Sequence, residues 1–267
     1  MPLAKLERTV LRFSGENLKP WLDGLITNSL NAPLTFAALL TPQGKIIADF
    51  FIHQNKEQWG DDILLETAPK FTTPILKRLK MYKLREKIDI NEVSTHSIYV
   101  LWDGEGDIGE LDPRHTGLGR RLVSTDIIET TASAEDYDLH RLALSIPDSH
   151  YDFETQTTFP ANANMDVING VDFKKGCFVG QEVVSVMKRK TEVKKRMRAV
   201  TSEQPLELGS IMAGERVVGD ILYANGNVGM AMIRLDRLAK TEEPPRAIRS
   251  LRNAPSGSDI QIIDLNT

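Results

Sequence analysis

The hydrophobic residues change their spacing in the last third of this 267-residue chain. Residues 216–222 and 228–233 are short apolar runs, and turns that contain glycine separate them from their neighbours. Short runs with such turns are typical of a small antiparallel β-barrel. We therefore predict a barrel domain over residues 193–267, connected through a linker around residues 190–205.

The first two-thirds mix helical and strand-like patterns. Apolar residues at positions 18, 21, 22 and 25 have the spacing of a helix face that packs on a sheet. The other predicted segments are strands at 9–13, 36–40, 45–52 and 97–102, a turn at 41–44, a helix after Pro74 with Leu76, Leu79 and Leu84, a surface loop at 103–119, a helix at 134–144 capped by Ser133, and packed loops at 145–175. These patterns indicate an α+β fold.

The composition allows a large core and argues against several classes of protein. The chain is 41% hydrophobic, yet it has no apolar run of about 18 residues, so we expect neither a membrane span nor a membrane partner. Its N-terminus lacks the apolar region of a signal peptide, and one cysteine cannot form an internal disulfide. We expect a cytoplasmic protein.

The only cysteine, Cys177, is preceded by two lysines and by Gly176, and Gly180 follows it three residues later. Lysines next to a thiol favour its thiolate, and so does the N-terminus of a helix. Glycine lets the backbone take positive φ or lets a ligand approach closely. The alternative is a glycine turn beside a small, buried, apolar cysteine.

Residues 181–187, directly after this segment, have the pattern of a helix start. Glu182 would lie in the first turn, where the helix dipole favours a negative charge. Gln181 and Glu182 are therefore either hydrogen-bonding partners of the loop or a ligand, or simply the beginning of a helix.

Residues 174–182 read Lys-Lys-Gly-Cys-Phe-Val-Gly-Gln-Glu, and this segment resembles the signature of the YgfZ family of folate-binding proteins. That family is related to the glycine-cleavage T-protein, an aminomethyltransferase, and its mitochondrial members serve iron–sulfur protein maturation. The resemblance extends along nearly the whole chain. Further similar stretches are 21–28, 41–49, 82–88, 112–114 with 118–119, and Phe159-Pro160 with Asn162 and Met165.

The resemblance implies a T-protein-like fold of three domains around a central opening that holds folate. Two interleaved domains would occupy residues 1–192, and the third would be the barrel. It also implies that tetrahydrofolate or a derivative is the ligand and that Cys177 is the functional side chain, in the position of a catalytic residue. The implied folate-binding residues are Asn28, Arg141, Lys175, Gly176, Gly180, Gln181 and Glu182.

Two departures from the T-protein pattern bear on enzymatic activity. T-proteins have an acidic pair after the glycine turn, where this chain has Ile47 and Ala48. Asp49 lies one step further along the strand, and one step turns a side chain to the opposite face. Aminomethyl transfer is therefore in doubt, and whether the protein is an enzyme stays open. Arg141 is kept, but Ala143 replaces the usual glutamate, so Arg141 either pairs with a folate carboxylate or forms an ion pair with Asp138 or another acid.

Positive charge is concentrated near the signature. Although the chain has a net charge of −4, seven of the eleven residues at 188–198 are Lys or Arg. Such a run can bind tRNA or another anion, or it can be an ordinary solvated surface. It lacks the interleaved aromatic residues that stack on bases.

We predict a folate-binding accessory protein that acts in the assembly or repair of iron–sulfur proteins, with client or assembly proteins as partners. The alternatives are a tRNA-modification or RNA-binding factor and a residual aminomethyltransferase. No metal site is predicted, since the five histidines have no metal-ligand spacing and a single thiolate cannot hold a cluster.

Overall fold

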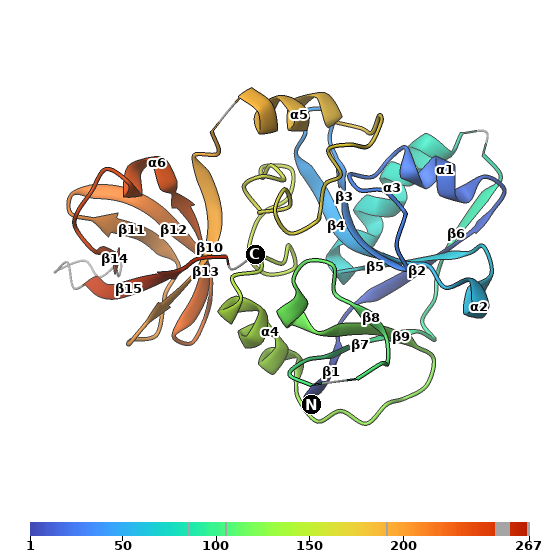
Figure 1. The fold of residues 1–267 in the computed structure, drawn as a ribbon, viewed down its shortest axis with the longest axis horizontal. Helices are drawn as coiled ribbons and strands as arrows, with labels where there is room; N and C mark the ends of the chain where they lie inside the picture. The colour runs from blue at the N-terminus through green and yellow to red at the C-terminus, as the bar shows by residue number, and fades with distance from the viewer. Residues whose placement is uncertain (85, 105, 191, 249–256, 266–267) are drawn as a thin grey trace.

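The computed structural model describes residues 1–84, 86–104, 106–190, 192–248 and 257–265. Arg85 of the family-like stretch and Thr191 of the basic run lie outside the described residues. In the described part, two antiparallel sheets come from the first 124 residues and a closed antiparallel barrel from the last 73 (Figure 1).

The first sheet has five strands in the order β3-β4-β5-β2-β6. They are β2 (Thr9–Gly15), β3 (Leu34–Leu40), β4 (Ile46–His53), β5 (Ile63–Thr67) and β6 (Ile88–Glu92). Helices α1 (Leu18–Asp23) and α3 (Thr72–Lys83) pack on one face, next to the turn η1 (Pro69–Phe71), and α2 (Lys56–Trp59) connects β4 to β5. Every residue of β3, β4 and β5 is buried, because both faces of these strands are covered.

The second sheet has the order β1-β7-β9-β8 and interleaves with the first along the chain. Its strands are β1 (Leu3–Leu6), β7 (Ser97–Leu101), β8 (Glu110–Leu111) and β9 (Arg120–Ser124), with the turn η2 (Thr116–Leu118) before β9. Helix α4 (Ala134–Ala143) follows. Its predicted cap is confirmed: Ser133 and Asp136 form a reciprocal capping box.

Residues 144–180 form neither helix nor strand, which confirms the loops predicted at 145–175, and α5 (Gln181–Lys190) comes next. The barrel then closes in the order β10-β13-β12-β11-β14-β15, with β15 paired to β10. Its elements are β10 (Lys195–Ser202), β11 (Gly209–Ala213), β12 (Arg216–Asn225), β13 (Val228–Arg234), α6 (Leu235–Leu238), β14 (Pro245–Ile248) and β15 (Gly257–Ile263). The predicted barrel is confirmed, but the predicted linker at 190–205 is too long, because β10 already begins at Lys195.

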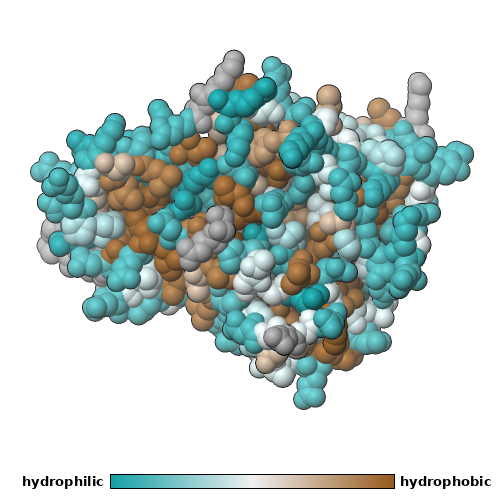
Figure 2. Space-filling view, viewed as in Figure 1, coloured by the Kyte–Doolittle hydropathy of each residue, from teal (hydrophilic) through white to brown (hydrophobic). Residues whose placement is uncertain are grey.

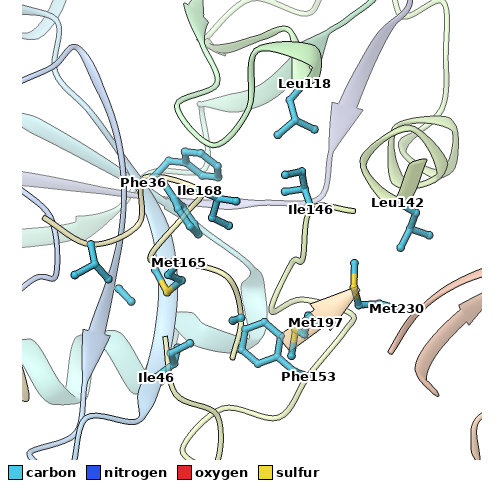
Figure 3. Packing of buried hydrophobic residues seen from close by; sticks show 14 of the residues in the cluster. Phe36, Ile46, Leu118, Leu142, Ile146, Phe153, Met165, Ile168, Met197 and Met230 are labelled. Atoms are coloured by element: carbon cyan, nitrogen blue, oxygen red, sulfur yellow. The ribbon is translucent and has the colours of Figure 1, made fainter. Parts of the chain in front are cut away.

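One hydrophobic cluster joins the barrel to the rest of the molecule (Figure 3). It brings together Phe36 of β3, Met165 and Ile146 of the loops, Met197 of β10 and Met230 of β13. A second cluster lies under α1 and α3, and a third fills the barrel. On the face seen in Figure 2, hydrophilic residues predominate, and hydrophobic ones gather over the barrel and the middle of the molecule.

Two local predictions were wrong. Leu84 does not continue the apolar face of the helix with Leu76 and Leu79, because α3 ends at Lys83 and Leu84 is 88% exposed. The segment 103–119 is not simply a surface loop, since it contributes β8 and the buried side chains of Asp112, Arg114 and Leu118.

Candidate functional site

Cys177 is exposed to solvent on the loop that leads into α5. The alternative of a buried, packing cysteine is therefore wrong. The expectation that a helix follows at 181–187 is confirmed by α5, which has Glu182 in its first turn. The thiol thus lies on the surface, four residues before the helix begins.

The loop before Cys177 is fixed by hydrogen bonds to the segment 27–29. The Asp172 backbone N–H donates to the Thr27 carbonyl (3.0 Å), and the Ser29 hydroxyl donates to Asp172 Oδ2 (2.6 Å). Asp172 Oδ1 accepts the Lys174 N–H (2.8 Å). These bonds hold the Asp172 pKa below its usual value, the Ser29 bond contributing most. Two stretches about 145 residues apart in sequence therefore form one structural unit.

Lys175 connects the same loop to α1. Its ammonium Nζ donates to the Asn28 carbonyl (2.7 Å) and lies 3.3 Å from Asp23 Oδ1. Only 3% of the Lys175 side chain is exposed, and burial lowers its pKa in spite of the Asp23 carboxylate. The ammonium is thus occupied by protein groups.

The other residues expected to bind folate lie in the same region, but most of their polar groups have protein partners. The Asn28 amide donates to the carbonyls of Phe36 (3.0 Å) and Asn169 (2.6 Å). The Gln181 amide donates to the Lys175 carbonyl (3.3 Å). Glu182 and Gly176 are exposed. The structure therefore brings Asn28, Lys175 and Gln181 together, and it uses their donors to order the cysteine loop.

Gly180 lies where no larger residue fits. Its φ is +83°, and a Cβ at this position would lie 2.7 Å from the Thr41 carbonyl oxygen. On the other side of the contact, a Cβ on Gly44 would lie 3.0 Å from Cβ of Val183 in α5. Gly180, directly before α5, therefore packs against the backbone of the turn between β3 and β4, and the Val183 side chain of α5 packs against Gly44 of the same turn. Gly176, by contrast, has open space around it.

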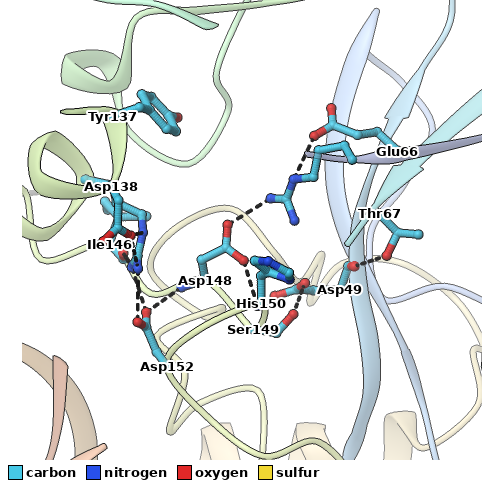
Figure 4. A network of polar contacts seen from close by, with 12 residues as sticks. Asp49, Glu66, Thr67, Tyr137, Asp138, Ile146, Asp148, Ser149, His150 and Asp152 are labelled. Carbon is cyan, nitrogen blue, oxygen red and sulfur yellow. Dashed lines mark hydrogen bonds and ion pairs between the residues drawn. The ribbon is translucent and has the colours of Figure 1, made fainter. Parts of the chain in front are cut away.

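Charged side chains form a buried network between the two sheets and the loop at 146–152 (Figure 4). Arg8 contacts Glu66 (3.3 Å) and Asp148 (2.8 Å), and Arg121 donates to Glu66 (2.6 Å). Glu66 also contacts His53 (3.0 Å). Despite burial, these cations hold the pKa values of Glu66 and Asp148 below their usual range.

Asp49 lies at the edge of this network. It accepts a short hydrogen bond from the Ser149 hydroxyl, and burial with the nearby Asp148 charge raises its pKa to about 6. Ile47 and Ala48, where T-proteins have carboxylates, belong to the hydrophobic cluster under α1 and α3. The contact with Ser149 gives Asp49 a structural partner in the loop at 146–152.

Arg141 is fully buried, and all its donors are used by the protein. It donates to Asp138 (2.8 Å), to Asp152 through two bonds (2.7 and 3.0 Å) and to the Ile146 carbonyl (3.0 Å). Of the two interpretations open from the sequence, the structure shows the ion pair with Asp138, and it adds Asp152. Arg141 does not present a free guanidinium to a ligand.

A cavity opens beside the network. It is lined in part by Arg8, Tyr137, Asp148, His150 and Tyr151. Tyr151 is 42% exposed, and the centroid of its ring lies 5.4 Å from that of Tyr223 on barrel strand β12. The cavity therefore combines an aromatic face with charged groups of both signs, where the barrel meets the N-terminal part.

The basic run at 188–198 is partly neutralised by the protein itself. Arg196 makes two bonds to Asp166 (2.7 and 2.9 Å), and Lys188 lies 3.7 Å from the same carboxylate. Arg198 pairs with Asp264 (3.3 Å). The run is therefore not a continuous row of free cations. Thr191 and the Lys190 side chain lie outside the described part of this run.

The described residues contain no group of three or more His, Cys, Asp or Glu side chains placed to hold a metal ion. They also contain no helix long and apolar enough to cross a membrane.

The buried network and the cavity were missed by reasoning from the sequence. The partners Arg8 and Asp148 are 140 residues apart, and Asp49 and Ser149 are 100 apart. The available signal was a charged residue within an apolar strand, such as Glu66 in β5. That signal predicts burial and a partner, but it does not identify the partner.

The fold of the chain is T-protein-like. The solved structure of glycine cleavage system aminomethyltransferase T from Bartonella henselae aligns with 98% of this chain, over 85% of the length of the solved chain, with a TM-score of 0.70. Only 12% of the aligned residues are identical, so the likeness shows the fold alone.

Comparison with other sequences identifies the family. Residues 194–253 match the CAF17 C-terminal β-barrel domain. The mitochondrial iron–sulfur cluster assembly factor IBA57 homologue of Mycosarcoma maydis is 30% identical over 73% of this chain and 56% of its own length, and that of Neurospora crassa is 30% identical over 73% and 52%. Human IBA57 is 26% identical over 86% of this chain and 76% of its own length. The chain spans about half the length of the two fungal relatives. It belongs to the IBA57/CAF17 family, to which YgfZ is related.

Proposed function

We propose that this protein is an iron–sulfur cluster assembly factor that offers Cys177 as a ligand to a cluster shared with a partner protein. The observation that carries the proposal is the position of Cys177: an exposed thiol on a loop whose neighbours are fixed by Asp172, Lys175 and Gln181. The family relatives are named as assembly factors, which supports this class of activity.

The chemistry of the cluster explains why a partner is needed. Clusters are usually held by four ligands, mainly thiolates, and these 267 residues contain one cysteine. The remaining ligands would come from the partner. A single ligand from this protein makes the shared cluster easy to release, as a cluster in transit requires.

Complementation tests this proposal. In cells deleted for the gene, we expect the wild type to restore the activity of a [4Fe–4S] enzyme such as aconitase, and Cys177→Ser to fail at equal protein level. Lys174→Ala serves as the matched control, because Lys174 is an exposed neighbour. Full restoration by both Cys177→Ser and Cys177→Ala would contradict the role of the thiol.

We further propose tetrahydrofolate or a derivative as a ligand, supported by the T-protein-like fold. Asn28, Lys175 and Gln181 do not fit as a ligand set, since their donors are occupied. The cavity beside Tyr151 fits better in its chemistry. Its aromatic face at Tyr151 suits a ring, whereas Arg8 and Asp148 pair with each other and are not counted in the ligand set.

Calorimetric titration with tetrahydrofolate would test this ligand. We expect saturable binding by the wild type and by Cys177→Ala. Tyr151→Ala should bind with lower affinity. Absence of binding by the wild type would remove folate from the proposal and leave the cluster role untouched. The tRNA alternative is less favoured, because Arg196 and Arg198 are engaged with Asp166 and Asp264.

A further inference from the structure

Helix α3 has an unusual charge content for a helix on the surface of an acidic protein. It contains four Lys or Arg residues and no Asp or Glu, while the chain as a whole has a net charge of −4. Neighbouring acids pair with cations at and after the end of the helix: Asp89 lies 3.7 Å from Lys83, the last residue of α3, and Glu16 lies 3.7 Å from Lys87, which follows the helix. Lys77 and Lys80 have no ion pair among the described residues.

The solvent-facing side of α3 also carries large apolar groups. Its inner side is formed by Ile75 and Leu79, which are completely buried. Its outer side is formed by the exposed residues Lys77, Lys80 and Met81, spaced i, i+3 and i+4, and the exposed Leu84 follows directly after the last helical residue, Lys83. Met81 is 58% exposed and Leu84 is 88% exposed. We call these four residues the α3 outer face.

Helix α1 extends this surface. The Trp21 indole N–H of α1 donates to the Tyr82 carbonyl (3.3 Å), so the two helices are held side by side (Figure 1). Both rings are only partly buried, and Lys19 of α1 is exposed. Aromatic rings, aliphatic side chains and lysines occur together where proteins contact the interfacial layer of a bilayer.

We propose that the α3 outer face binds an anionic lipid surface, with Leu84 and Met81 entering the headgroup layer and Lys77 and Lys80 facing lipid phosphates. The charge of the helix is complementary to such lipids. RNA would also attract the lysines, but it gains little from two exposed aliphatic side chains.

This binding departs from the sequence-based expectation of no membrane partner. That expectation rested on the lack of an apolar run long enough to span a bilayer. A helix that lies on a membrane needs no such run, because only one face enters the headgroup region.

Vesicle flotation tests the proposal with the purified chain. We expect binding to vesicles of phosphatidylcholine mixed with phosphatidylglycerol, much weaker binding to phosphatidylcholine alone, and weakening with added salt. Because one lysine near an anionic surface contributes about fivefold in affinity, K77E/K80E should reduce binding by roughly 25-fold or more. M81S/L84S should reduce it by about tenfold.

Two control variants match these changes elsewhere on the surface. K194E/K195E makes the same charge change in two exposed lysines, and I127S removes an apolar side chain that is 97% exposed. Both should bind almost as the wild type does. Near-ultraviolet circular dichroism verifies that each variant is folded.

Equal binding to both kinds of vesicle, or equal losses for K77E/K80E and K194E/K195E, would overturn the proposal. So would failure to float with any vesicle while the wild type, but not K77E/K80E, is retained by RNA in a filter assay. That last outcome would assign the face to nucleic acid instead.

Discussion

The Cα of Gly44 lies 3.1 Å from the place where a Cβ on Gly180 would stand. This contact joins the turn between β3 and β4 to the start of α5, the two stretches that most resemble the YgfZ pattern. The start of the helix after Cys177 is therefore positioned by backbone packing against the first sheet.

Gly180→Ala should lower the free energy of unfolding by about 2 kcal/mol or more. The positive φ costs an alanine about 1 kcal/mol, and its Cβ must also displace the Thr41 carbonyl. Urea denaturation measures the loss. Gly176→Ala is the matched control, because nothing lies within 4 Å of its Cβ position, and it should stay within about 0.5 kcal/mol of the wild type. Equal effects of the two changes would refute the packing argument.

Lys175→Met should loosen the cysteine loop. The change leaves the Asn28 carbonyl without its donor and Asp23 without its cation, at a cost of about 1–3 kcal/mol. Hydrogen exchange should show faster exchange of the amides at 172–177. Lys174→Met, at an exposed position, should leave exchange unchanged. Unchanged exchange in Lys175→Met would show that the loop is held by Asp172 alone.

Arg141→Met should destabilise the protein by about 3–5 kcal/mol, because Asp138 and Asp152 would lose a buried cation. Arg141→Lys should rescue little, since an ammonium cannot reproduce the two-bond contact with Asp152. The exposed pair of Arg12 and Asp62 gives the comparison, and Arg12→Ala should cost no more than about 1 kcal/mol. A fully stable Arg141→Met that had lost folate affinity would restore Arg141 as a ligand residue.

Asp49→Asn should change how stability depends on pH. The pKa of Asp49 is raised to about 6 in the folded protein, from 3.8 as its ordinary value. Between about pH 4 and 6 the native state therefore binds more protons than the unfolded state, and stability falls as the pH rises. The ionised carboxylate costs on the order of 3 kcal/mol at neutral pH. The amide of the variant avoids this cost, and it still accepts the Ser149 bond.

Unfolding experiments from pH 4 to 8 check this. The stability of the variant relative to the wild type should increase up to about pH 6 and then stay constant. Asp152, whose pKa is also raised to about 6, is present in both proteins and cancels in the difference. A constant difference over the whole range would mean that Asp49 keeps an ordinary pKa.

Several elements were predictable because their causes are local. The cap of α4 needs only Ser133 and a nearby acid, and the turn at 41–44 needs only its proline and glycine. Leu84 shows the limit. Its spacing fits a helix face, but it lies one residue beyond the end of α3, and the spacing alone does not say which apolar residues the core will cover.

The candidate site also has features that local sequence determines and features that depend on distant contacts. The sequence by itself determined the signature around Cys177, the helix that follows it and the small barrel, because short-range patterns of glycine, charge and apolar residues specify them. Only the tertiary structure decided that Cys177 is exposed, that Lys175 is held by Asn28 and Asp23, and that Arg141 belongs to a buried ion network. Those outcomes depend on which groups, distant in sequence, shield one another from water in the folded chain. A buried charge is stable only when the fold brings a partner to it.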